Sequence, residues 1–299
     1  MNDGQAAGQP QQRDLDYVRL ARTALPLLRF MVSGYKQIDL AAFEEDPRRL
    51  AGPVSIQRQI ESIESAVKLS EAELGHMAAA FIRASCEELI WLRYLYTLRR
   101  DDARTLLLKL SLNDSGRSVQ ALRDYAGTDA MVGMGWPSAL LGDLDALVEG
   151  NRNDLKAIAK ELGWPGPKPN LQWLADSVGK GNFYAYLYAA TSRANHFSAA
   201  EVFRRLWFES RTGPISVGHP AHRSYLTNFA CDTLLRICMM TLADLTPQME
   251  FEPEAEGDLQ AAEEMAMKFA AVSTELQALG KVPIIRPEEF NLLQGPIPD

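Results

Sequence analysis

The chain has 299 residues, 46% of them hydrophobic, which is enough to build the core of one large helical domain or two smaller ones. Its formal net charge of -8 argues against general, sequence-independent DNA binding, because a polyanion would be repelled unless the basic residues were segregated. The three cysteines form no CxxC pair and stand within apolar stretches, which favours a reducing, cytoplasmic location. No stretch approaches the roughly 18 uninterrupted apolar residues that a membrane span requires, so membrane insertion is not expected.

The N-terminal residues 1–12 are polar and predict a disordered leader rather than a secretory signal. Residues 13–249 follow as one helical bundle domain. Its first helix is expected over 15–38, with a kink or break at Pro26. After a loop containing Pro47, Gly52 and Pro53, the helical period restarts at Ile56 and continues to near Arg100. The second half of this long helix is apolar on nearly every side, which predicts the centre of the fold.

The remaining pattern also predicts helices, separated by glycine and proline stops. They are expected, in chain order, over 101–127, 138–162, 170–178, from Asn182 through the aromatic run, and from Pro220 to before Pro247. Between them, 206–217 fits two short strands around a turn, or a helix that runs on through Trp207. Residues 250–299 read as an acidic linker, a terminal amphipathic helix and an extended tail. The predicted fold class is all-α, a multi-helix bundle with at most one small β-hairpin.

Two polar stripes interrupt the apolar helices. Arg83 and Glu87 are four residues apart and share a face of the most apolar helix, where an unpaired charge would be costly. Tyr188, Ser192 and His196 repeat the same spacing on the aromatic helix. These stripes are expected to meet across a helix pair, as a hydrogen-bonded network that holds the helices in register or as a catalytic or ligand site.

The segment from Arg83 to Glu87, in a run ending Leu92-Arg93-Tyr94, resembles a widespread prokaryotic family of unknown function. The later Tyr188, Ser192 and His196 series resembles the same family, which is distantly similar to the HEPN superfamily. The resemblance spans about residues 60–245. It implies a helical, often dimeric protein, with metal-independent ribonucleases of toxin and antiviral defence systems among its relatives.

The expected catalytic pattern of that superfamily is an arginine, a polar residue and a histidine a short distance on. Here the usual spacing is missing, because Arg193 stands only three positions before His196. The two side chains can still share a helix face, with the imidazole drawing a proton from a ribose 2'-hydroxyl and the guanidinium holding the phosphate. Asn195 could support the histidine or contact the nucleotide. The hypothesis is therefore a catalytic site at Arg193, Asn195 and His196, supported by Arg83, Glu87, Tyr188 and Ser192, without metal or other cofactor.

Two other features are weaker candidates. His219 and His222 are three apart but lack an adjoining cysteine or carboxylate cluster, which argues against a metal site. The basic pairs at 99–100 and 204–205, with Arg211 and the nearby aromatic residues 207 and 208, could line a groove for single-stranded nucleic acid.

Two classes of function stay open. The first is an enzyme or nucleic-acid effector of HEPN type, acting on RNA or a nucleotide in a prokaryotic defence or toxin system. The second is a non-catalytic helical scaffold that binds a partner protein. Both predict a homo-oligomer, with a homodimer as the expected form, because amphipathic helices flank the body of the chain.

Overall fold

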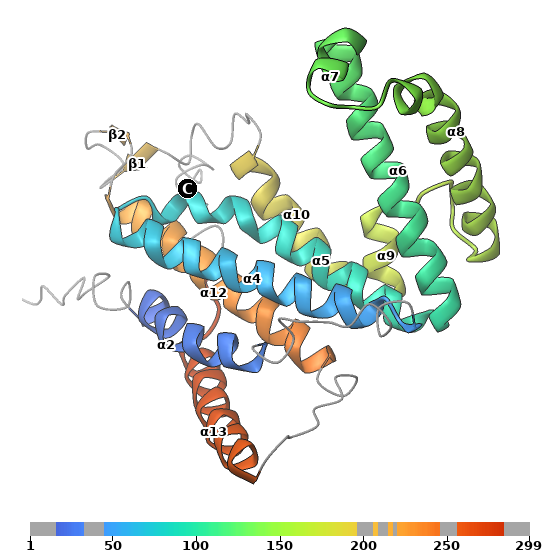
Figure 1. Ribbon diagram of the computed structural model, residues 1–299. Coiled ribbons are helices and arrows are strands. Elements are labelled where there is room, and N and C mark those ends of the chain that lie inside the picture. Colours follow the sequence, from blue (N-terminus) through green and yellow to red (C-terminus); the bar gives the residue numbers. More distant parts are fainter. Residues whose placement is uncertain are drawn as a thin grey trace, which may run out of the picture. The chain divides into compact units, whose positions relative to one another are not determined.

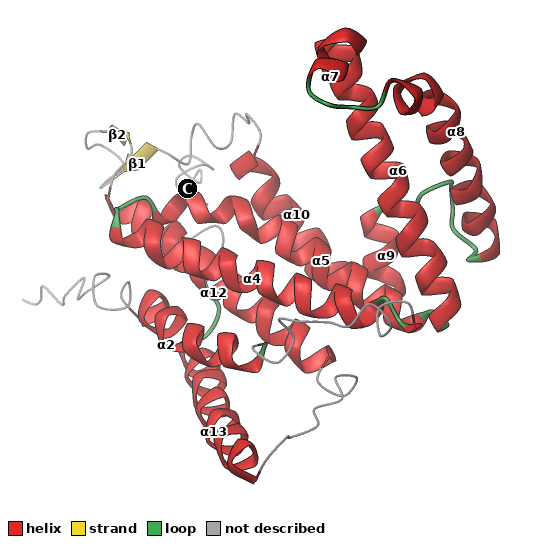
Figure 2. Ribbon diagram, in the orientation of Figure 1, coloured by secondary structure: helices red, strands yellow, loops and turns green. Residues whose placement is uncertain are grey.

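The computed structural model describes residues 16–32, 45–195, 206–208, 215–217, 220–245 and 256–283. Nearly all of these residues are helical, as the colouring of Figure 2 shows, so the predicted all-α class is confirmed. Of the two alternatives for 206–217, the structure has the pair of short strands: β1 (Leu206–Phe208) pairs antiparallel with β2 (Ile215–Val217). Within the described residues, no helix combines the length and apolar character needed to cross a bilayer.

The chain forms two compact units, and each is assembled from separate stretches of sequence. The first unit comprises Met1–Ile38, Gly52–Leu89 and Asn182–Asp299, and the second comprises Asp39–Ala51 and Ile90–Gly181. The expectation from sequence was a single body over 13–249. No linker in the sequence marks the division, because a boundary between the units can lie inside a continuous helix. The boundary between Leu89 and Ile90, for example, lies within an uninterrupted helix.

The first unit is built from long helices packed through aliphatic side chains. Its elements are α2 (Asp16–Met31), most of α4 (Arg48–Glu71), the 3-10 turn η2 (Gly75–Ala78), the first half of α5 (Ala79–Thr97), α10 (Gly181–Asn195), α12 (Pro220–Leu245) and α13 (Glu256–Leu279). Helix α12 packs on η2 and on α2, and α13 packs on α2 (Figure 1). The largest fully buried side chains include Leu20, Leu28, Ile56, Ile60, Ile63, Ile82, Leu89 and Phe229.

The end of α13 is attached to α12 through a buried ion pair. Arg236 donates to Asp232 at 2.6 Å, to the Leu276 carbonyl at 2.7 Å and to the Gly280 carbonyl. Asp232 also accepts a hydrogen bond of 3.0 Å from the Val282 amide. The guanidinium therefore satisfies carbonyl oxygens that the helix terminus leaves without a partner, and its charge suits the negative end of the helix dipole.

The second unit is a helical hairpin with a supporting short helix. Helices α6 (Arg100–Ala126) and α8 (Ser138–Glu161) pack side by side and are connected through α7 (Thr128–Gly133), with α9 (Leu171–Ser177) following (Figure 1). Gly163, with φ of 68°, follows the end of α8, as expected from the glycine stop. Asn170 caps α9, because its side chain accepts from the Trp173 amide at 2.7 Å.

The prediction of one long helix from Ile56 to Arg100 is wrong. Helix α4 ends at Glu71, and Glu73 adopts a positive φ of 60° while the Leu74 amide donates to the Leu69 carbonyl at 2.8 Å. This is the hydrogen-bond pattern of a helix C-terminal cap, normally marked in sequence by glycine. Glutamate is a good helix former, so the sequence pattern continued through the break.

Other predicted helix limits also need correction. Helix α4 begins within the expected loop, directly after Pro47, and includes Gly52 and Pro53, both buried. Its start is stabilised by Asp46, whose carboxylate accepts from the Arg48 amide at 3.1 Å. Pro26 lies within α2 without ending it, and α10 starts at Gly181, so Asn182 lies inside that helix rather than capping it.

Candidate functional site

The first polar stripe is an ion pair on an accessible face of α5. Arg83 Nε lies 2.8 Å from Glu87 Oε1, one helical turn away, and both side chains are about 30% exposed (30% and 29%). The hydrogen bond to Glu87 raises the pKa of the Arg83 guanidinium, so the arginine is a permanent cation with a fixed direction. This charge is paired and still reachable from solvent.

The second stripe meets the first across the α5–α10 pair. The Arg83 guanidinium lies over the Tyr188 ring, 4.8 Å from its centroid, in cation–π geometry. Tyr184, one turn earlier on α10, lies 5.8 Å from Tyr188 between ring centroids. Burial, and secondly the charge of Glu87, raise the pKa of the Tyr184 phenol, which therefore stays protonated at neutral pH. We call Arg83, Glu87, Tyr184 and Tyr188 the α5–α10 ridge.

The predicted catalytic residues follow this ridge along the chain. Ser192, Arg193 and Asn195 belong to the last turn of α10, but their side chains are outside the described part of the structure, and His196 lies entirely outside it. The structure thus brings together Arg83, Glu87 and Tyr188, while the arrangement of the catalytic side chains stays a prediction.

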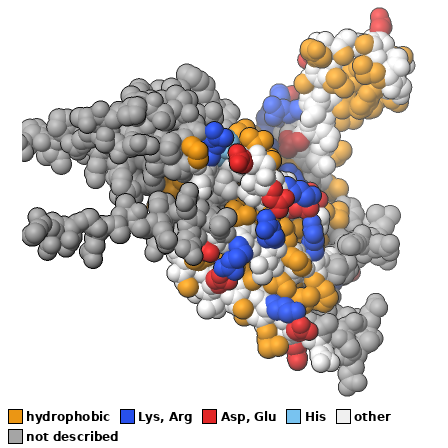
Figure 3. Space-filling view, turned by 90° about the vertical axis from the view of Figure 1, so that its left-hand side faces the viewer, with side chains coloured by type: hydrophobic (Ala, Val, Ile, Leu, Met, Phe, Trp, Pro, Cys, Tyr) orange, Lys and Arg blue, Asp and Glu red, His pale blue; other side chains and the backbone are white. Residues whose placement is uncertain are grey.

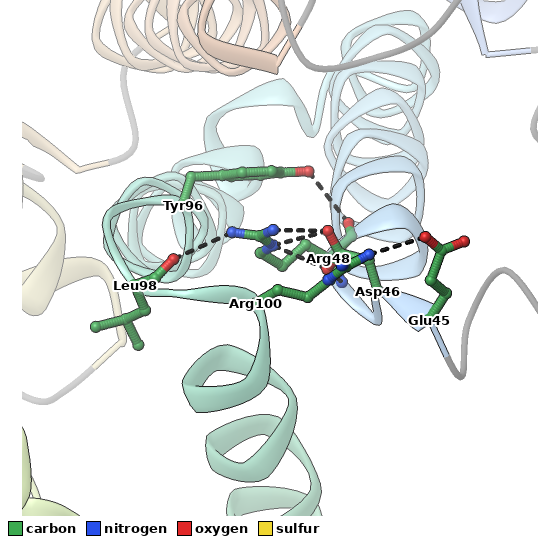
Figure 4. Close-up of polar contacts among 6 residues, drawn as sticks. All are labelled: Glu45, Asp46, Arg48, Tyr96, Leu98 and Arg100. Atoms are coloured by element: carbon green, nitrogen blue, oxygen red, sulfur yellow. Dashed lines mark hydrogen bonds and ion pairs between the residues drawn. The ribbon is translucent and has the colours of Figure 1, made fainter.

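The basic pair at 99–100 does not offer free positive charge. Arg99 lies 3.2 Å from Asp102, and Arg100 donates to Glu45 at 2.8 Å (Figure 4). Arg204, Arg205 and Arg211 lie outside the described residues, and of residues 207 and 208 only the backbone is described. On the face shown in Figure 3, positive and negative side chains are intermixed among the coloured atoms, so the described residues of this face form no broad basic surface.

The neighbouring Arg48 has a structural role in the second unit. Its guanidinium donates to both carboxylate oxygens of Asp46 and, at 3.2 Å, to the Leu98 carbonyl at the end of α5 (Figure 4). It also lies 5.4 Å from the centroid of the Tyr96 ring, whose hydroxyl donates to the Arg48 carbonyl at 3.2 Å. Burial opposes ionisation of Asp46, but the hydrogen bonds from Arg48 outweigh it and lower the pKa of that carboxyl. These contacts fasten the start of α4 to the end of α5.

Of the two histidines that were considered as a metal site, the structure describes one. His222 is buried on α12, and His219 lies outside the described residues. Among the residues that are described, no group of three or more histidine, cysteine or acidic side chains is placed to hold a metal ion.

Sequence reasoning missed two residues near the ridge. Tyr184 precedes Tyr188 by four positions, so the same helical spacing that singled out Tyr188 could have included it. Glu88 stands on the other side of α5, with its side chain 15% exposed and 3.0 Å from Arg58 of α4. Burial raises the pKa of Glu88 to about 7, although the Arg58 charge acts in the opposite direction. No pattern within α5 could reveal this, because the effect depends on the neighbouring helix.

A family model described as "Family of unknown function (DUF5677)" matches residues 55–213, slightly more than half of the chain. The chain belongs to this DUF5677 family. The match begins within α4 and extends past the end of α10, so it includes both helices of the α5–α10 ridge. No curated protein and no solved structure gives a significant match. The predicted membership in a family of unknown function is therefore confirmed, whereas its relation to the HEPN superfamily and to prokaryotes stays a prediction.

Proposed function

We propose that this DUF5677 protein is an HEPN-like, metal-independent ribonuclease whose active site lies at the end of α10. The observation that carries the proposal is the α5–α10 ridge. An arginine held by Glu87 and stacked on Tyr188 presents a cation and an aromatic face, both accessible, since Tyr188 is 44% exposed. Such a pair suits a phosphate and a stacked base of a single-stranded nucleotide.

The proposed chemistry uses the residues at the end of the same helix. His196 takes the proton of a ribose 2'-hydroxyl, and the 2'-oxygen attacks the adjacent phosphorus. Arg193 stabilises the added negative charge on the phosphate, and Asn195 orients the nucleotide. The bond from phosphorus to the 5'-oxygen breaks, and that oxygen takes the proton from the imidazolium. The products are a 2',3'-cyclic phosphate and a 5'-hydroxyl.

The charge balance of the protein limits the mode of binding. With a net charge of -8 and mixed charges on the face of Figure 3, affinity has to come from a few close contacts. We therefore expect a short single-stranded segment, recognised by stacking on Tyr188 and by phosphate contacts, rather than a long duplex held by a basic surface.

The test is cleavage of an end-labelled single-stranded RNA in the presence of EDTA. We expect a 2',3'-cyclic phosphate product, no cleavage of DNA of the same sequence, and a loss of about 100-fold or more in rate for His196→Ala. His219→Ala is the matched control, because it removes a histidine outside the α10 stripe. RNA cleavage that is absent in the wild type, or unchanged in His196→Ala, would refute the proposal.

A second candidate function, a homo-oligomeric scaffold, is supported by apolar side chains exposed on the second unit. Tyr125 at the end of α6 is 90% exposed, Met134 after α7 is 64% exposed, and Val132 and Leu140 are also exposed. Hydrophobic side chains gather at the top of the view in Figure 3, over the α7 end. If this surface joins two copies, light scattering after size-exclusion chromatography will show a dimer in the wild type and a monomer in Tyr125→Ser/Met134→Ser.

A further inference from the structure

A groove in the first unit lies between the facing sides of α4 and α5, away from the α5–α10 ridge. Each helix lines it with four side chains spaced i, i+3, i+4 and i+7, from Arg58 to Ser65 on α4 and from Phe81 to Glu88 on α5. The contact between Arg58 and Glu88 shows that the two stripes run in opposite directions. The groove is therefore a continuous channel along one helix pair.

Small side chains leave this part of the helix pair unfilled. In the register set by the contact between Arg58 and Glu88, Ser62 lies opposite Ala84 in the middle of the groove, where an ordinary helix pair would interdigitate larger residues. Ser65 lies opposite Phe81. The resulting groove is open to solvent along one side and has a volume of about 160 Å³. A protein cavity of about 150 Å³ is large enough to hold benzene. The groove therefore has room for a ligand with a body the size of one six-membered ring.

Above its pKa of about 7 the Glu88 carboxyl is ionised, and the charged groups of the groove then favour a cation. Glu88 and Glu61 supply two carboxyl groups and Arg58 a single guanidinium. Arg58 is 64% exposed, so a competing cation can displace its guanidinium into solvent and take its place beside Glu88. Glu88, by contrast, is largely buried and has a fixed position at the end of the channel.

We propose that the α4–α5 groove binds a small organic cation, a primary ammonium carried on an apolar body of about one ring. The ammonium replaces Arg58 as the partner of Glu88, and Glu61 adds a second negative charge at the rim. The serine hydroxyls accept its remaining N–H groups, and the apolar body lies along Ala84 toward the Phe81 ring.

The experiment titrates the full chain with benzylammonium and follows the backbone amide signals of Ser85 and Glu88 by NMR. We expect saturable shifts with a Kd of about 1 mM, as suits a ligand of so few atoms. Benzyl alcohol, which lacks the charge, is expected to bind at least 10-fold more weakly, and benzoate not at all.

Two variants and one control locate the site. Glu88→Gln is expected to weaken benzylammonium binding at least 10-fold, and Ala84→Leu, at an exposed position on the groove wall, to abolish it by filling the channel. Glu263→Gln, which removes an exposed carboxylate from α13, should bind as the wild type does. No saturation at 20 mM, equal binding of benzylammonium and benzyl alcohol, or unchanged binding by Glu88→Gln would each overturn the proposal. RNA cleavage does not enter this assay, so its outcome is independent of the proposed nuclease function.

Discussion

The buried carboxyl of Glu88 is expected to make the stability of the protein fall as the pH rises. Its pKa is about 7 in the folded chain, compared with an ordinary value of 4.5. Because the folded value is the higher one, the folded state holds the proton more tightly between these two pH values. The stabilisation is therefore complete below about pH 4.5 and is lost as the pH rises through 7. For these two pKa values the loss between pH 5 and pH 8 is about 2–3 kcal/mol.

Glu88→Gln isolates this effect, because glutamine has a similar shape and does not titrate. We expect the free energy of unfolding of the wild type, measured by urea denaturation, to fall relative to the variant by about 2–3 kcal/mol from pH 5 to pH 8. Glu61→Gln, at an exposed position of the same groove, should follow the wild type. Parallel pH profiles for the wild type and Glu88→Gln would show that Glu88 is not shifted and would refute the reasoning.

Three further predictions concern packing and buried groups. Gly75→Ala should cost about 1–3 kcal/mol in urea unfolding, because the new Cβ would lie 2.4 Å from Thr227 Cγ2, and Thr227→Ala should recover much of this loss. Arg236→Met should lower the free energy of unfolding by about 3–5 kcal/mol, since it leaves Asp232 buried without its cation. Adding Asp232→Asn should restore part of this stability, and no restoration would contradict a role of the ion pair. Burial raises the pKa values of the three thiols, Cys86, Cys231 and Cys238, to about 12. At pH 8, iodoacetamide should therefore alkylate none of them in the native protein and all three in the denatured protein, as counted by mass spectrometry.

Local patterns were sufficient to predict the helices whose ends carry strong signals. Gly163 marks the end of α8 because its backbone takes a positive φ, and Asn170 marks the start of α9 because its side chain caps the helix. Both effects are local, so the residue type alone predicts them. The end of α4 was missed because a glutamate takes the left-handed position there. Just after this break, Gly75 fits closely against Thr227 of α12, a contact that is distant in sequence.

At the candidate site, too, local spacing predicted contacts of the α5–α10 ridge but not the α4–α5 groove. Helical spacing alone placed Arg83 with Glu87, and it correctly indicated a meeting with the aromatic helix at Tyr188. The groove on the opposite side of α5 depends on which helix lies next to Ser85 and Glu88, and this is a property of tertiary packing. The division into two units was also hidden, since the boundaries within α4, α5 and α10 fall inside helices rather than at linkers.

The two consecutive glutamates of α5 make the ridge and the groove separable by experiment. Successive helical residues are about 100° apart around the axis, so Glu87 faces α10 while Glu88 faces α4. Each carboxylate is paired with a different arginine, Arg83 on its own helix and Arg58 on the next. Glu87→Gln should therefore impair the positioning of Arg83 and leave benzylammonium binding intact. Glu88→Gln should weaken benzylammonium binding and leave the positioning of Arg83 intact. If both variants impaired both properties, α5 would couple the two faces, and neither could be treated as an independent site.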